Sequence, residues 1–330
     1  MKTQKVRTLL AQTMIRRRQK ARVNTAKALL RPDVITAVLV GTGGPMPSAR
    51  VQSCTALFVN GQFLLFDAGD GAARRMEALH LPVAQLQAVF MTHYHADHFA
   101  DLGEVIDRSW ILGRRHRLPV HGPVGIARIV AGFHQAYTLE YGYRAAHHGD
   151  ELMPLQWAEA QALEFDSPAA SGSVSVYERD GVTVTAFPVL HPPIVPNVGY
   201  RIEFDGRAVV LSGDTVFTDT LLQQSRGADL LISDVMAMDA VEQIERGNQA
   251  GGNETTAQIM HDIRDYHISA EELGSLAEEA QVKRLALTHL SPPVEQRLLI
   301  NSYFKRPIAA RYTGKIVVGH DGTRIVIPRA

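Results

Sequence analysis

Seven consecutive residues, Thr92-His93-Tyr94-His95-Ala96-Asp97-His98, place three imidazoles and a carboxylate within six positions, directly after an apolar run at 88–92. Protonated imidazoles this close would repel one another, whereas neutral imidazole and carboxylate bind divalent metals well. The single cysteine, Cys54, excludes both a Cys-rich metal site and an intramolecular disulfide. The spacing therefore predicts a metal site made of histidine and carboxylate.

The His-x-His-x-Asp-His pattern after a strand resembles the signature of the metallo-β-lactamase superfamily. Four further motifs occur in the order that this family has: Asp67 in FDAGDG, His191 in VLHPP, Asp214 in LSGDT and His289 in LTHL. The resemblance covers about residues 34–293. It implies an α+β fold, the four-layer αββα sandwich of the metallo-hydrolases, with two metals at the strand ends.

The resemblance also implies a ligand set. His93, His95 and His191 would hold the first metal, and Asp97, His98 and His289 the second, with Asp214 bridging them and Asp67 supporting the metal loop. A set of His and Asp without cysteine suits two Zn²⁺, with Mn²⁺ or Fe as alternatives. Two such metals can hold a bridging hydroxide and neutralise a leaving oxygen, so the expected chemistry is hydrolysis.

Further residues resemble one branch of the superfamily, that of ribonuclease Z and the arylsulfatase-like proteins. The loop VGTGGPMPSAR (40–50) is similar to its glycine-rich first loop. Asp234 and His267 match an acid and a histidine proposed in ribonuclease Z to protonate the leaving oxygen; a carboxylate orients an imidazole and favours its protonated form. Asp97, Asp234 and His267 are therefore candidate catalytic residues. A loop-capping role for Asp234, and a surface or helix-capping role for His267, stay open.

The expected substrate is a small ester, either a phosphodiester or a sulfate ester. Only 22 residues separate His191 from Asp214, too few for the tRNA-gripping arm that bacterial ribonuclease Z carries there. Residues 32–330 have 24 basic and 34 acidic side chains, and this excess of acid repels RNA. Both observations argue against tRNA as a partner. Two alternatives remain: a lactonase or β-lactamase acting at a carbonyl, and a noncatalytic nucleic-acid-binding member that uses a basic arm.

That arm is the first of two expected regions. Residues 1–31 contain ten Lys and Arg and no acid, which predicts a basic helix or disordered arm over 1–32, ended by Pro32. A catalytic domain follows over 33–330, with a Pro-, Gly- and Ser-rich insertion or lid at about 132–180. No apolar run is long enough to span a membrane. In the absence of a secretory signal we expect a cytoplasmic protein, with the periplasm and a homodimer left open.

The elements that must position these residues follow from apolar patterning. Short β-branched runs predict strands at 34–40, 55–59, 62–66, 88–92, 182–189, 198–204, 207–211, 228–233, 284–288, 315–319 and 323–327. Helices are expected near 70–80, 99–113, 124–138, 254–265 and 270–280. Ser269, followed three residues later by Glu272, predicts a capping box at the start of the last helix.

Overall fold

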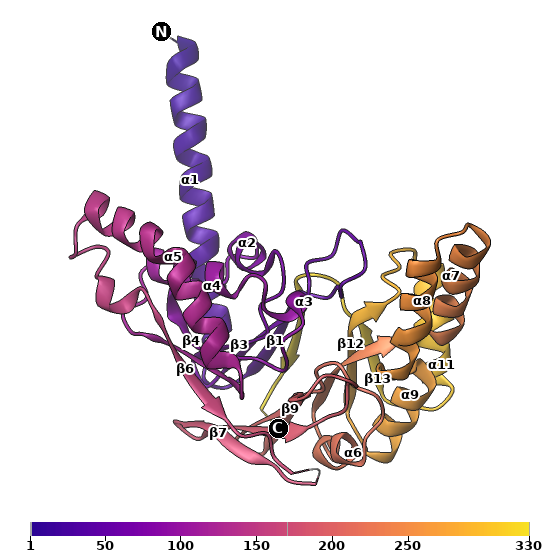
Figure 1. Cartoon of the computed structure of the whole chain (residues 1–330). Helices are drawn as coiled ribbons and strands as arrows, with labels where there is room; N and C mark the ends of the chain where they lie inside the picture. Colours follow the sequence, from indigo (N-terminus) through magenta and orange to yellow (C-terminus); the bar gives the residue numbers. More distant parts are fainter. Residues whose placement is uncertain (1, 170, 330) are drawn as a thin grey trace.

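The computed structural model describes residues 2–169 and 171–329, and for residues 2–11 and 18 it describes the backbone alone. Residues 1, 170 and 330, which fall in the expected arm, lid and catalytic domain, lie outside the described residues. Within this part of the chain, two seven-stranded sheets face each other, and helices cover their outer faces (Figure 1). The expected αββα sandwich is confirmed.

The first sheet is formed mainly by the N-terminal half of the chain. Its strands are β1 (Ile35–Gly41), β2 (Cys54–Val59), β3 (Gln62–Phe66), β4 (Leu86–Phe90), β5 (Leu118–Pro123), β6 (Ala160–Phe165) and β14 (Thr323–Ile327). Their order is β14-β1-β2-β3-β4-β5-β6. The strands β3 to β6 run parallel to one another, so their carboxyl ends lie at one edge of the sheet.

The second sheet comes from the C-terminal half. Its strands are β7 (Val174–Arg179), β8 (Val182–Pro188), β9 (Val198–Phe204), β10 (Arg207–Leu211), β11 (Leu230–Met236), β12 (Arg284–Ser291) and β13 (Lys315–Val318). They are ordered β13-β12-β11-β10-β9-β8-β7, and β10 to β13 are parallel. The open crevice at the carboxyl ends of parallel strands is where α/β proteins commonly bind ligands.

The core between the sheets explains the apolar runs in the sequence. Strands β1, β2, β3, β10 and β11 are buried along their whole length because a sheet with both faces covered has no solvent side. Phe66 of the first sheet packs against Tyr200 of the second with ring centroids 5.5 Å apart, and against Phe90 at 5.0 Å. The contact between Phe66 and Tyr200 joins the two sheets.

Helices form the two outer layers. Those on the side of the first sheet are α2 (Ala72–Ala78), α3 (Ala96–Phe99), α4 (Leu102–Ile111) and α5 (Ile126–His148), with the short turns η1 (Val83–Gln85) and η2 (Leu155–Trp157). Those on the side of the second are α6 (Asp219–Ser225), α7 (Met238–Ala250), α8 (Glu254–Asp262), η3 (Ile263–Asp265), α9 (Ala270–Glu279), α10 (Arg297–Ile300), the π-helix η4 (Asn301–Lys305) and α11 (Arg306–Ala309). The predicted capping box of Ser269 and Glu272 is present at the start of α9.

Two regions differ in detail from the sequence expectation. The segment of about 132–180, expected as an insertion or lid, contains the second half of α5 and the strands β6 and β7, which are edge strands of the two sheets. Its Pro, Gly and Ser residues lie largely in the turns between these elements. The basic segment forms one helix, α1 (Lys2–Leu29), which extends away from the sandwich (Figure 1). No helix among the described residues is long and apolar enough to cross a membrane.

Candidate metal centre

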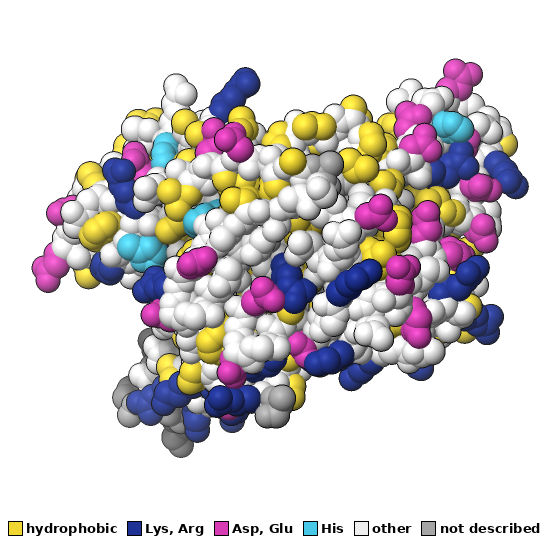
Figure 2. Space-filling model, turned by 90° about the horizontal axis from the view of Figure 1, so that it is seen from below, with side chains coloured by type: hydrophobic (Ala, Val, Ile, Leu, Met, Phe, Trp, Pro, Cys, Tyr) yellow, Lys and Arg dark blue, Asp and Glu magenta, His cyan; other side chains and the backbone are white. Residues whose placement is uncertain are grey.

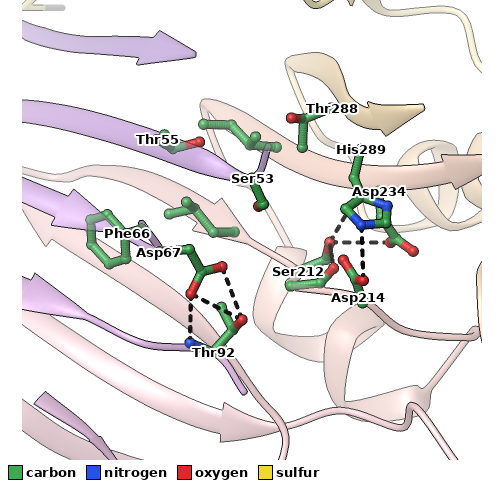
Figure 3. Close-up of a pocket in the computed structure, with 13 residues that line it drawn as sticks. Ser53, Thr55, Phe66, Asp67, Thr92, Ser212, Asp214, Asp234, Thr288 and His289 are labelled. Atoms are coloured by element: carbon green, nitrogen blue, oxygen red, sulfur yellow. Dashed lines mark hydrogen bonds and ion pairs between the residues drawn. The ribbon is translucent and has the colours of Figure 1, made fainter. Parts of the chain in front are cut away.

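Asp67 anchors the loop that carries the histidine motif. It follows β3 in a left-handed conformation (φ 56°). Its Oδ1 accepts a hydrogen bond from the Thr92 backbone N–H at 2.9 Å, and its Oδ2 lies 2.9 Å from the Thr92 hydroxyl and 2.8 Å from His98 Nδ1 (Figure 3 shows the Thr92 contacts). Because the carboxylate accepts a hydrogen bond from His98 Nδ1–H, the Nε2 of this ring is directed toward Asp214.

The first group of ligand-type atoms belongs to His93, His95 and His191. His95 Nδ1 lies 3.1 Å from His93 Nε2 and 3.2 Å from His191 Nε2. His191 Nδ1 donates to the backbone carbonyl of Tyr266 at 2.8 Å, which again leaves Nε2 free. Burial lowers the pKa of all three histidines, that of His191 to about 4. They are therefore neutral at pH 7, the form that binds metal.

The second group contains Asp97, His98, Asp214 and His289. Asp214 Oδ2 lies 3.2 Å from both His98 Nε2 and His289 Nε2, and Asp97 Oδ2 lies 3.1 Å from His289 Nε2. Burial alone would raise the pKa of both carboxyls, but the histidines lower it by more. Burial likewise lowers the pKa of His98 and His289, and the carboxylates outweigh it, raising that of His289 to about 9.

This donor set fits divalent metal ions. The candidate ligand atoms within each group lie within 4.8 Å of one another, and Asp214 also forms a group with His191 and His267. Asp214 thus reaches toward both sets of histidines. Among the described residues the buried Nδ1 of His289 has no hydrogen-bond partner, whereas Nε2 contacts the carboxylates of Asp97 and Asp214. Two adjacent sites with a shared carboxylate are the arrangement of two-metal hydrolases.

Asp234 and His267 form a pair beside these groups. His267 Nδ1 lies 2.9 Å from Asp234 Oδ2, and both side chains are buried. Asp234 lies at an irregularity in the pairing of β11 with β12, and His267 precedes α9. Burial raises the pKa of Asp234, and the hydrogen bond from His267 opposes this shift. The pair can therefore hold an imidazole in one orientation at the edge of the metal-type cluster.

A cavity of about 360 Å³ opens above the cluster. Its lining includes His95, Asp97, His191, Asp214, His267 and His289, together with Pro45, Gln52, Ile263 and Tyr266. Beneath it, Asp214, Asp234 and His289 line one part of a small buried pocket and Asp67 with Thr92 another (Figure 3). The structure thus brings together every predicted site residue. Sequence reasoning missed Gln52 and Tyr266, which have no metal-ligand chemistry to single them out.

The sandwich fold and the clustered His and Asp side chains define a metal-dependent hydrolase of the metallo-β-lactamase class. A family model described as "Beta-lactamase superfamily domain" matches residues 62–290. The chain is 36% identical over 293 residues to the Ribonuclease Z of Mycobacterium bovis (strain BCG / Pasteur 1173P2), covering 88% of this chain and 97% of that protein. The chain belongs to the β-lactamase superfamily and, within it, to the ribonuclease Z family.

Solved structures agree on the fold. The metallo-beta-lactamase fold protein YhfI from Bacillus subtilis superposes with a TM-score of 0.62 at 21% identity, over 89% of this chain and 100% of that one. Human tRNase Z, short form, gives a TM-score of 0.64 at 20% identity, over 89% and 99%. The family model and the mycobacterial relative carry the functional assignment: the chain is a metal-dependent hydrolase that acts on ester bonds.

The expected partners, a small-molecule ester and not tRNA, were wrong. The relatives are ribonucleases, and the alignment takes in nearly all of the mycobacterial enzyme, so little of that protein lacks a counterpart here. The two arguments against tRNA were too weak to exclude it. The missing arm is only one segment of the protein, and a net charge of −10 does not show where the charges lie on the surface. The relatives lend no support to the arylsulfatase-like part of the resemblance.

Proposed function

We propose that this protein is a ribonuclease Z-type phosphodiesterase that processes transfer RNA in the cytoplasm. The observation that carries the proposal is the placement of the His267–Asp234 pair beside two groups of metal-type ligands, where Asp214 of the second group also clusters with His267 and with His191 of the first. A phosphodiester of RNA has a poor leaving group, the ribose oxygen, which needs a proton as the bond breaks. The similarity to ribonuclease Z supports RNA as the substrate.

The ligand assignment is part of the proposal. His93, His95 and His191 would hold one divalent ion and Asp97, His98 and His289 the other, with Asp214 between them. Zinc is the first choice for imidazole and carboxylate ligands, and Mn²⁺ or Fe are the alternatives. When bound, such ions supply an activated water at neutral pH and neutralise charge on the phosphate.

The side chains of this chain then move two protons. Asp97 accepts a proton from the water whose oxygen attacks phosphorus. The bond between phosphorus and the ribose oxygen breaks, and that oxygen takes the proton carried by His267 Nε2. Asp234, which accepts the hydrogen bond from Nδ1, holds this ring in place and stabilises its charged form. One water is consumed, and the products are a hydroxyl end and a phosphate monoester end.

A single substitution tests the metal-dependent step. His95→Ala removes a ring nitrogen that lies within 3.2 Å of both His93 and His191. We expect cleavage of a precursor tRNA by the zinc-loaded variant to fall at least about a thousandfold, because a lost ligand disrupts the site. His148→Ala, which removes an exposed histidine at the end of α5, is the matched control and should leave the rate unchanged. Wild-type protein that cleaves no precursor tRNA, or a His95→Ala variant of normal rate, would reject the proposal.

A further inference from the structure

The last two turns of the helix α1 contact the body. Leu29 is buried in the core cluster on the outer face of the first sheet. Arg22, Val23 and Ala26 line a surface cavity together with residues 80–85. The preceding residues, 2–21, lead away from the sandwich in Figure 1. At 1.5 Å per residue, this projecting part is about 30 Å long.

The charge of this helix is uniform in sign. The segment 1–31 contains ten Lys and Arg and no acid. Arg16, Arg17, Lys20, Arg22 and Lys27 are exposed, and within the described part of the chain none of them forms an ion pair. Positions 16, 20 and 27 fall within about 40° of one another around the helix, so their cations form one stripe.

Such a helix is poorly stabilised by itself. Like charges four residues apart, such as Arg16 and Lys20, weaken a helix. Basic residues near the N-terminus oppose the helix dipole, and an isolated helix in water is marginal in any case. Neutralisation by a row of phosphates removes these costs, because each bound phosphate offsets one cation and releases counterions.

The apolar residues of α1 do not favour a second copy of the chain as the occupant. Met14, Ile15 and Val23 are exposed by 61%, 56% and 52%. Among the described side chains of α1, these three spread over about half of the circumference and form no seam of the kind that pairs two helices. The basic stripe is therefore the feature of α1 that repeats along its length.

We propose that α1 is an RNA-binding arm, which contacts backbone phosphates of the tRNA outside the catalytic cavity. The inference rests on the proposed function. In Figure 1, α1 extends toward the same upper side on which α3, the helix of Asp97 and His98, lies. An RNA seated at the cavity can thus extend along the arm. This arm supplies a row of exposed positive charge, whereas the short connection between His191 and Asp214 contains two arginines, Arg201 and Arg207, each paired with an acidic side chain.

The test is a triple substitution in the full-length, zinc-loaded protein. Arg16→Gln, Lys20→Gln and Lys27→Gln together remove the stripe and keep residues that favour helix. The matched control is Arg306→Gln, Arg311→Gln and Lys315→Gln, three exposed cations on and after α11. Binding of a mature tRNA is measured by fluorescence anisotropy from about 50 to 200 mM salt. Cleavage of precursor tRNA and of bis(p-nitrophenyl) phosphate is measured alongside.

The arm variant should bind tRNA about tenfold or more weakly, with the slope of log Kd against log salt reduced by about 2 to 3. Its KM for precursor tRNA should rise with little change in kcat, and its rate on bis(p-nitrophenyl) phosphate should stay that of the wild type. Three results would overturn the proposal that α1 binds RNA: unchanged tRNA affinity in the arm variant, an equal loss of affinity in the control, or a change in oligomeric state in the arm variant alone. Wild-type protein that binds tRNA through α1 but does not cleave the precursor would instead reject the proposed function.

Discussion

The histidines of the site are held by different partners. The Nδ1 atoms of His98 and His267 each contact a buried carboxylate, Asp67 and Asp234, whereas Nδ1 of His191 donates to a backbone carbonyl. In each ring this contact fixes which nitrogen faces the cavity. A carboxylate stabilises a charged imidazole more than a carbonyl does. Because both the proposed ligand His98 and the proposed acid His267 contact a carboxylate, the type of partner does not by itself separate a metal ligand from a proton donor.

A leaving-group comparison tests the role of His267. We expect His267→Ala to slow the cleavage of precursor tRNA by about 10²- to 10⁴-fold, because the ribose oxygen leaves poorly without a proton. The same variant should lose less than about tenfold on bis(p-nitrophenyl) phosphate, since nitrophenolate needs little protonation. The measurement is kcat/KM on both substrates at one zinc concentration, with Asp234→Asn as a companion that keeps the size of the side chain and removes the charge beside the ring. Equal losses on the two substrates would contradict the acid role.

For single residues, the sequence predicts which side chains could bind metal better than it predicts the groups that hold those side chains in place. The His-x-His-x-Asp-His pattern places four ligand-type residues on one loop, and the motif order brings in His191, Asp214 and His289. His267 is one of fourteen histidines, and only the resemblance distinguishes it. The backbone carbonyl of Tyr266 has no sequence signal at all, because every residue carries such a group. Whether these residues bind metal stays a prediction.

Among the elements, the loop between β1 and β2 depends on one distant side chain. Asp321, near the C-terminus, accepts hydrogen bonds from the backbone N–H and hydroxyl of Thr42 at 3.1 and 2.8 Å, from the Val51 N–H at 2.8 Å, and from Arg75 at 3.0 Å. The loop it fixes carries Pro45 and Gln52 into the wall of the catalytic cavity. Asp321 is thus a positioning residue for one wall of the site.

Loss of this carboxylate should therefore affect both stability and substrate binding. We expect Asp321→Ala to lower the free energy of unfolding by about 2 to 4 kcal/mol, because several donors lose a charged acceptor. The KM for precursor tRNA should rise more than kcat falls. Urea unfolding and steady-state kinetics measure the two effects. Glu159→Ala, which removes an exposed partner of Arg117, should cost less than about 1 kcal/mol. A similar cost for both variants would show that the loop does not depend on Asp321.

The elements that the sequence missed have identifiable reasons. β5 contains Pro119 and Pro123 with Gly122 between them, a composition that argues against a strand, yet it pairs on both sides. β7 lies at a sheet edge and is partly exposed, so it lacks a continuous apolar run. α5 continues ten residues beyond its expected end at 138, up to Gly149, because packing on α4 and β6 overrides two internal glycines. Buried strands were predicted best because burial on both faces leaves the clearest pattern.

For the whole molecule, the zero net charge combines two regions of opposite sign. Residues 1–31 contribute +10 and the remainder −10. Over most of the face in Figure 2, Lys and Arg are mixed with Asp and Glu, so that face has no single sign of charge. Part of the acidic excess, Asp97 and Asp214, lies buried in the candidate metal centre. The total charge was therefore a poor guide to the substrate. Bound cations would offset these buried carboxylates, and the positive charges of α1 are concentrated in one helix.

The same burial couples metal binding to the stability of the fold. Buried carboxylates and imidazoles drawn from both halves of the sandwich converge within 4.8 Å, so ions held there connect the two sheets. We expect each bound ion to add about 1.4 kcal/mol to the free energy of unfolding for every tenfold rise in free metal above its dissociation constant. Wild-type protein in zinc buffers should therefore gain about 2.7 kcal/mol per decade if two ions bind. His191→Ala, which removes a ligand of the first group and none of the second, should halve this slope. Chemical denaturation in each zinc buffer measures this slope. If the wild-type protein gains only about 1.4 kcal/mol per decade, the value for one ion, the assignment of two metals is wrong, while the membership of the hydrolase family stands.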